Sequence, residues 1–182
     1  MPSVSGGKNF PRGIAVGLPE LINYCFDAQT CNLRYAWTGG FLDMQPSWSG
    51  RGGNVVKVLG KRFYTENAFP LHIGESEGEA ARAFVGYVFD GGKPQFIYRV
   101  GDVEIHETIA APEKDLGLVR TFAFDSGGKS VTFSAIDEPG TTYASSAGEW
   151  QAEQVGDKPG RVLKLPGGKQ KFSVTITVKD AK

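Results

Sequence analysis

The stretch from residue 95 to residue 109, QFIYRVGDVEIHETI, decides the fold of this chain. The apolar runs on either side of Gly101-Asp102 point to two strands joined by a tight turn, because glycine and aspartate adopt the backbone conformations that short hairpin turns need. In the second run, VEIHETI, apolar and polar residues alternate, which is the pattern of a strand with one buried and one wet face. The stretch therefore predicts an antiparallel hairpin.

The same pattern recurs outward along the chain in both directions. Short runs rich in Val, Ile, Phe and Tyr are separated by Gly, Pro and Asp, and a Gly-Gly-Lys turn follows each of residues 90, 126 and 166. We expect these turns to close hairpins in a meander, and the chain to form an all-β antiparallel sandwich of two packed sheets. The predicted strands are residues 13–17, 22–26, 33–38, 83–90, 95–100, 103–109, 117–125, 130–135, 142–145, 161–165 and 170–178.

Two regions depart from this pattern of short apolar runs separated by turns. Residues 39–70 contain only two candidate strands, 54–59 and 62–64, so we expect one long irregular loop region of the kind that often serves as a binding loop. Residues 76–82, SEGEAAR, predict either about two turns of helix with Ser76 as N-cap or a charged loop. The sequence thus predicts at most one short helix.

Length and charge limit the classes of protein. At 182 residues the default is a single β-sandwich domain over residues 1–182, with two small domains as the upper limit, and it could be excised from a larger multi-domain protein. Lys plus Arg and Asp plus Glu number 20 each, so no basic field exists to bind nucleic acid. No apolar run approaches the roughly 18 residues of a membrane span, and the N-terminus lacks a signal-peptide pattern, which predicts a soluble chain with no membrane span.

The candidate ligand-binding residues are Trp37, Asp43, Trp48 and Arg51, which stand among glycines in a segment without regular alternation. Indole rings offer flat apolar faces and the two charged groups can form paired hydrogen bonds, a combination that grips sugar rings and other polar cyclic ligands. A structural interpretation stays open beside it. The tryptophans could plug the open end of the sandwich while Asp43 and Arg51 pair with each other or cap loop backbone.

Cys25 and Cys31 are separated by five residues. In an oxidising compartment this spacing could close a disulfide loop that contributes about 2 kcal/mol. Two half-buried thiols in a strand pair explain the spacing equally well. It matches neither a redox C-x-x-C, nor a structural zinc set, nor a haem attachment motif.

Histidines and carboxylates give only weak signals for catalysis or metal binding. His72 and His106 are far apart, so the sequence predicts no metal site and no cofactor. His106 shares a strand face with Glu104, and the two could form an acid–base pair, share a cation, or belong to a solvated polar face. Carboxylates sufficient for glycoside hydrolysis are present, with separations that a sequence does not give. They are Asp27, Asp43, Glu104 and Glu107.

Six segments together resemble a domain of large exported bacterial c-type cytochromes, which often also carry propellers like those of quinoprotein sugar dehydrogenases. The specific part is W-x-G-x-F-x-D followed by W-x-x-R-G, and the similarity spans about the first two thirds of the chain. The segments are RGIAVG at 12–17, YCFD at 24–27, LRYAWTGGFLD at 33–43, WSGRG at 48–52, FVGY at 84–87 and PQFIYRV at 94–100.

This resemblance implies a non-haem accessory domain of a periplasmic or secreted protein in carbohydrate or alcohol oxidation, with a cytochrome c or quinoprotein domain as redox partner. Haem is supplied there by a neighbouring C-x-x-C-H domain, a motif this chain lacks. The family pattern does not include both cysteines, which favours a local disulfide here. The positions carried over without an assigned role are Asp27, Trp37, Phe41, Asp43, Trp48 and Arg51.

Taken together, the sequence favours a non-catalytic ligand-binding or interaction module for carbohydrate or polysaccharide. The alternative is a carbohydrate-active hydrolase or lyase that uses carboxylates with or without His106.

Overall fold

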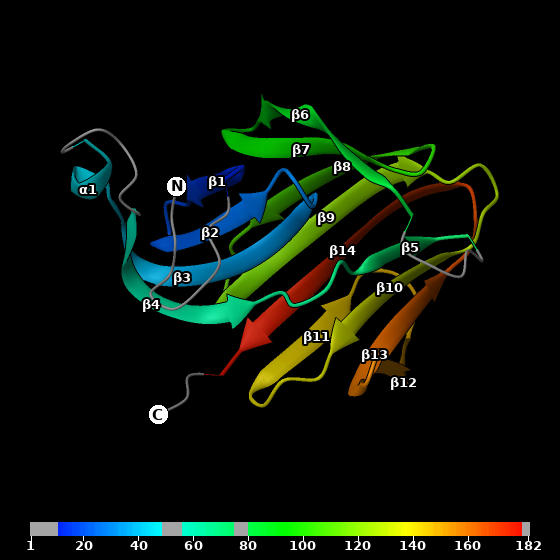
Figure 1. Ribbon diagram of the computed structural model, residues 1–182. Helices are drawn as coiled ribbons and strands as arrows, with labels where there is room; N and C mark the ends of the chain where they lie inside the picture. The colour runs from blue at the N-terminus through cyan, green and yellow to red at the C-terminus, as the bar shows by residue number, and fades with distance from the viewer. Residues whose placement is uncertain (1–10, 49–55, 75–79, 180–182) are drawn as a thin grey trace. The chain divides into compact units, whose positions relative to one another are not determined.

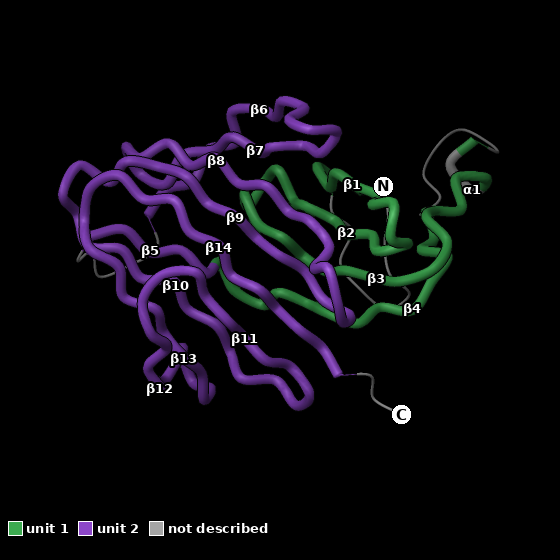
Figure 2. The backbone as a smooth tube through the Cα atoms, turned by 180° about the vertical axis from the view of Figure 1, so that it is seen from behind, with its two compact units in different colours: residues 1–69 green, residues 70–182 purple. Residues whose placement is uncertain are grey.

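The computed structural model describes residues 11–48, 56–74 and 80–179, and nearly all of their ordered structure is antiparallel β-sheet. The chain divides into two compact units, residues 1–69 (unit 1) and residues 70–182 (unit 2), shown in Figure 2. The length alone had predicted one domain by default and two at most. The all-β antiparallel class is confirmed.

Unit 1 is a four-stranded meander. β1 (Gly13–Gly17), β2 (Ile22–Asp27), β3 (Asn32–Asp43) and β4 (Lys57–Thr65) pair in chain order, and the four-residue α1 (Gln45–Trp48) follows β3 (Figure 1). β3 runs five residues beyond its predicted end, and β4 is a single strand where two short ones were predicted. Less of residues 39–70 is irregular than the sequence suggested.

Unit 2 holds two sheets. A six-stranded sheet has the order β11-β14-β9-β8-β7-β6 and a four-stranded sheet the order β12-β13-β10-β5 (Figure 1). The strands are β5 (Leu71–Ile73), β6 (Arg82–Asp90), β7 (Lys93–Val100), β8 (Val103–Ala110), β9 (Gly117–Asp125), β10 (Val131–Ile136), β11 (Thr141–Ser145), β12 (Trp150–Val155), β13 (Lys158–Leu165) and β14 (Lys169–Val178).

The predicted strands of unit 2 are found within a few residues of their expected ends, but β5 and β12 were missed. β5 has only three residues, too few for a periodic pattern, and β12 is polar and exposed along most of its length. The predicted helical turn lies mostly outside the described residues, and Arg82, its last residue, begins β6. No helix in the described residues is long and apolar enough to cross a membrane.

Not all of the Gly-Gly-Lys turns close hairpins, as the sequence had predicted they would. The turn after Asp90 joins β6 to its partner β7, as expected for a hairpin. The turns after Ser126 and Pro166 instead carry the chain from one sheet of unit 2 to the other. They also touch each other, since a Cβ added to Gly167 would lie 2.3 Å from the Gly128 backbone. The expectation that these two turns close hairpins is therefore wrong: the glycine spacing indicates a turn, but it does not indicate the sheet to which the next strand belongs.

The core of unit 2 lies between its two sheets. Phe122 and Phe172 of the six-stranded sheet stack with centroids 5.3 Å apart, and Phe133 of β10 meets Phe122 edge-on at 5.5 Å. The alternation of β8 is observed as predicted, with Val103 and Ile105 buried. Rings in such edge-on and offset arrangements add to the stabilisation from apolar burial.

Candidate functional site

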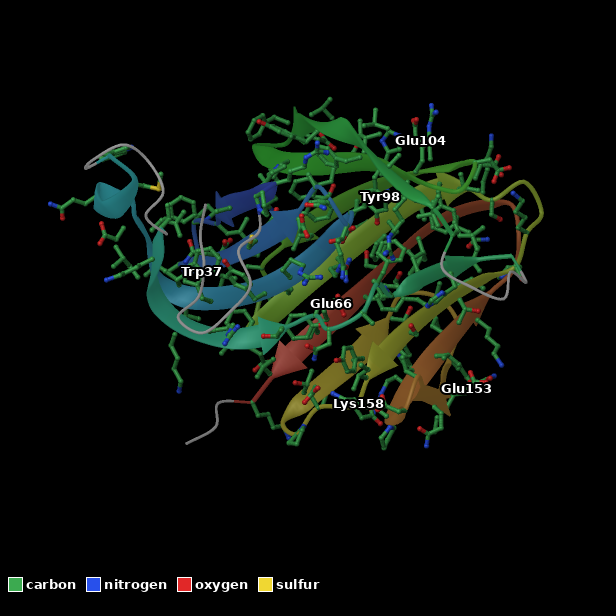
Figure 3. All side chains as sticks on the ribbon, in the orientation of Figure 1. Trp37, Glu66, Tyr98, Glu104, Glu153 and Lys158 are labelled. Atoms are coloured by element: carbon green, nitrogen blue, oxygen red, sulfur yellow. The ribbon has the colours of Figure 1, made fainter. Side chains whose placement is uncertain are left out.

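Trp37 occupies the core of unit 1 rather than its surface. Its ring is fully buried beside Cys25 and Tyr35, and its indole N–H lies 3.0 Å from the Gly40 carbonyl oxygen and 3.2 Å from that of Phe41. It thus offers no exposed face to a ligand. Trp37 lies in the middle of β3 and is labelled in Figure 3. Trp37 therefore stabilises the start of the segment that follows it, through hydrogen bonds to two of its carbonyl groups.

Glycines fix the path of that segment, residues 39–48. Gly39 has a φ of +95°, a conformation that side-chain-bearing residues rarely adopt. A Cβ on Gly40 would lie 2.7 Å from the Leu59 carbonyl oxygen, and one on Gly60 would lie 1.9 Å from that of Thr38. The backbones of β3 and β4 therefore approach more closely here than any larger residue would permit.

The 39–48 segment displays aromatic side chains. Phe41 stacks on the buried Trp37 ring with centroids 6.1 Å apart, yet it is 43% exposed, and Trp48 at the end of α1 is 79% exposed. Leu21, whose carbonyl accepts the Gly39 N–H, and Leu59, which contacts Gly40, are also exposed. The large apolar side chains exposed by the described part of unit 1 thus lie in this segment or beside it. Exposed apolar side chains that gather in this way mark candidate binding surfaces.

Asp43 and Asp27, two of the candidate carboxylates, stabilise local turns instead. Asp43 Oδ1 accepts a 3.0 Å hydrogen bond from the Gln45 N–H at the start of α1. Asp27 is buried; its Oδ1 accepts the Gln29 N–H at 2.9 Å and its Oδ2 accepts the Thr30 hydroxyl at 2.8 Å. Aspartate commonly stabilises turns in this way. Asp43 remains partly exposed between Phe41 and Trp48 along the chain.

Of the four predicted ligand-binding residues, the structure leaves Trp48 and Asp43 accessible in the 39–48 segment and buries Trp37. Arg51 lies outside the described residues, and so does any pairing of it with Asp43. Phe41, which only the family resemblance singled out, takes the exposed aromatic position that was predicted for Trp37. The Gly39-Gly40 pair before it was the available signal, because glycine in a strand often marks a bulge, and the pairing of β3 with β4 is irregular between Gly39 and Leu42.

Cys25 and Cys31 are thiols in this structure, and both are fully buried, more deeply than the half-buried thiols of one sequence interpretation. The disulfide that the family resemblance favoured is not formed. Cys25 packs in the core against Tyr35 and Trp37, while the Cys31 sulfur lies 4.0 Å from the Ala28 carbonyl oxygen within the turn. Burial raises the pKa of Cys25 to about 11 and also raises the pKa of Tyr35, so both groups are held in their neutral forms near neutral pH.

Glu104 and His106 lie together on the outer face of the six-stranded sheet. His106 Nε2 is 3.3 Å from Glu104 Oε1, its Nδ1 is 3.0 Å from Gln95 Oε1, and Arg99 completes the row 3.5 Å from Glu104. All are at least partly exposed. His72 stands on β5 in the other sheet of unit 2. Among the described residues no three His, Cys, Asp or Glu side chains are grouped so as to hold a metal ion.

Glu107 and Arg120 form a fully buried ion pair inside unit 2. Arg120 Nε donates to Glu107 Oε1 at 2.6 Å, and the Tyr98 hydroxyl donates to Glu107 Oε2 at 2.8 Å. The Arg120 guanidinium also lies 5.1 Å from the Phe122 ring centre, within the range of a cation–π contact. We call Tyr98, Glu107 and Arg120 the Glu107 cluster. It keeps this carboxylate away from any substrate.

The sequence did contain a signal for the Glu107 cluster that our sequence analysis did not use. Glu107 follows Val103 and Ile105 at every second position of its strand, and Arg120 follows Leu118 in the same way. Two charged residues of opposite sign at positions that the alternation assigns to the interior predict a buried pair. Figure 3 shows Tyr98 of this cluster and Glu104 of the outer row on adjacent strands.

The sequence model of one family, described as a domain of unknown function (DUF6797), matches residues 24–107. The match runs from β2 to β8, somewhat less than half of the chain, and includes both the 39–48 segment and Glu107. No curated protein and no solved structure matches the chain.

Proposed function

We propose that this protein is a non-catalytic ligand-binding module that binds carbohydrate or polysaccharide through the 39–48 segment. The observation that carries the proposal is the exposure of Phe41 and Trp48 in a segment whose first residues are held by the Gly39 and Gly40 backbone contacts and by the Trp37 hydrogen bonds. A rigid support lowers the entropy lost when exposed rings bind a ligand.

The chemistry of the segment suits a ring-shaped polar ligand. Aromatic faces pack against the C–H faces of a sugar, and the Asp43 carboxylate, partly exposed between the two rings in sequence, can accept hydrogen bonds from hydroxyl groups. The resemblance to domains of exported cytochromes supports a role in extracellular carbohydrate binding or oxidation. It also supports a periplasmic or secreted location and a cytochrome c or quinoprotein domain as redox partner.

Binding to a panel of immobilised polysaccharides, followed by calorimetry with a soluble oligosaccharide from the best one, tests the proposal. Trp48→Ala should weaken binding by about tenfold or more, the loss of roughly 1.4 kcal/mol. Trp48→Phe retains an aromatic face and should recover most of the affinity, and Phe41→Ala should weaken binding as well. The proposal fails if the protein retains none of the polysaccharides, or if Trp48→Ala binds as the parent protein does.

The contact between Glu104 and His106 favours the alternative, a carbohydrate-active hydrolase or lyase. A histidine beside a carboxylate can transfer protons, and both side chains are reachable from solvent. Release of reducing ends from any bound polysaccharide, abolished in His106→Ala and unchanged in Trp48→Phe, would support this alternative over simple binding.

A further inference from the structure

β6 forms one edge of the six-stranded sheet. It pairs with β7 on one side and, among the described residues, with no strand on the other. At nine residues it is longer than β11, the five-residue strand at the opposite edge. A long unpaired edge presents a row of backbone donors and acceptors to any strand that comes alongside.

The side chains of β6 do not protect this edge. Val85, Tyr87, Val88 and Phe89 are all about half exposed or more, with Phe89 at 73%. Natural edges are usually protected by charged residues along their length. β6 carries charge only at its two ends, where Arg82 begins the strand and Asp90 finishes it.

The middle of β6 is open. Gly86 stands beside a bulge in the pairing with β7, and a Cβ added to Gly86 would meet nothing within 4 Å. Glycine in a strand often marks a place where another backbone comes close. Gly86 therefore carries no side chain that could hinder a second strand at the centre of the edge.

We propose that β6 is the pairing edge for a second copy of this chain, so that two β6 strands run antiparallel across a two-fold axis. The ends of the strand argue for this occupant, because antiparallel pairing brings Arg82 of each copy near Asp90 of the other. Parallel pairing would place like charges together. A two-fold contact of one surface with itself is the commonest form of protein dimer, and it joins the two six-stranded sheets into one.

The oligomeric state tests the proposal first. Sedimentation velocity and light scattering across a concentration series should show a monomer–dimer equilibrium for the parent protein, and Val88→Lys should shift it to monomer. Leu59→Lys is the matched control, since it places the same charge at a similarly exposed strand position in unit 1 and should leave the dimer intact. The proposal is overturned if the parent protein stays monomeric at every concentration, or if Val88→Lys dimerises as the parent does.

A charge exchange tests the orientation of the strands. Arg82→Asp puts acidic residues at both ends of β6, and Asp90→Arg puts basic residues at both ends, so each variant alone should dimerise less well than the parent. An equal mixture of the two should recover dimer, because each copy then meets opposite charges. Circular dichroism of each variant checks that it folds. A mixture that dimerises no better than its separate components overturns the antiparallel arrangement.

Discussion

The two faces of β8 carry carboxylates in opposite circumstances. Glu107 points into unit 2, where Arg120 and Tyr98 contact it and no water reaches it, whereas Glu104 lies on the outer face with His106 and Arg99 partly exposed around it. Only two residues, Ile105 and His106, separate the two along the chain. The comparison teaches that residue type alone gave both carboxylates equal standing as candidates, whereas burial, which the alternation of β8 indicates, separates a structural group from an accessible one.

The largest expected effect is that of Glu107→Gln. Removing the negative charge leaves the Arg120 guanidinium buried without its counter-charge, which typically costs about 3–5 kcal/mol of folding free energy. Urea unfolding followed by circular dichroism measures the loss. A cost as small as that of an exposed pair would show that water reaches this part of the core and would remove the contrast between the two faces.

Tyr98→Phe should give the next largest effect. The change keeps the ring and deletes only the hydroxyl that donates to Glu107, and a hydrogen bond to a charged group is worth about 1.5–3 kcal/mol. The same unfolding assay applies. If the Glu107 cluster acts as one unit, the double variant Tyr98→Phe, Glu107→Gln should lose less than the sum of the two single changes.

Cys25 in unit 1 is also a fully buried ionisable group, and its burial predicts that the stability of the protein depends on pH. Its pKa is about 11 in the folded protein against 9.0 for the free thiol, so between these values the unfolded chain releases a proton that the folded chain keeps. The free energy of unfolding should therefore keep its full contribution from Cys25 below pH 9. It should fall as the pH rises toward 11, by up to about 1.4 kcal/mol per pH unit. Unfolding at stepped pH measures the slope, which Cys25→Ala should reduce. An equal slope in both proteins would contradict the assignment.

Glu104→Gln should have the smallest effect on stability. Its contacts with His106 and Arg99 are partly exposed, and such surface pairs contribute about 0–1 kcal/mol. Unfolding in urea, with and without added salt, checks both the size and the weak salt dependence. A loss close to that of Glu107→Gln would mean that the outer face is covered in solution.

The alternation of apolar and polar residues was enough to predict most of the strands. The residues of a turn or of a very short strand were not enough to predict how the remaining strands pair. The pattern of Val103–Ala110 was enough to orient β8, because each side chain there obeys a two-residue period. The three residues of β5 are too few to show one. The turns after Ser126 and Pro166 look the same as the hairpin turn after Asp90, because glycine sets the turn while distant packing chooses the sheet.

The sequence singled out the candidate segment but not which of its side chains are exposed. Residues 39–48 were singled out by their glycines and aromatics, and this segment does display exposed rings. The sequence could not tell that Trp37 would turn inward and Phe41 outward. That choice depends on the close backbone approach at Gly40 and Gly60, which involves two strands and cannot be read from either one.

The contact between Gly128 and Gly167 has a practical consequence for engineering. Both turns look like ordinary surface loops, yet a side chain at Gly167 would overlap the Gly128 backbone, and the Gly168 N–H donates to the Ser126 hydroxyl across the gap. Fluorescent reporters, affinity tags or new chain termini should be inserted at Gly156 between β12 and β13, where an added Cβ would meet nothing within 4 Å and the proposed β6 contact is left alone. The two crossings after Ser126 and Pro166 should be left unmodified.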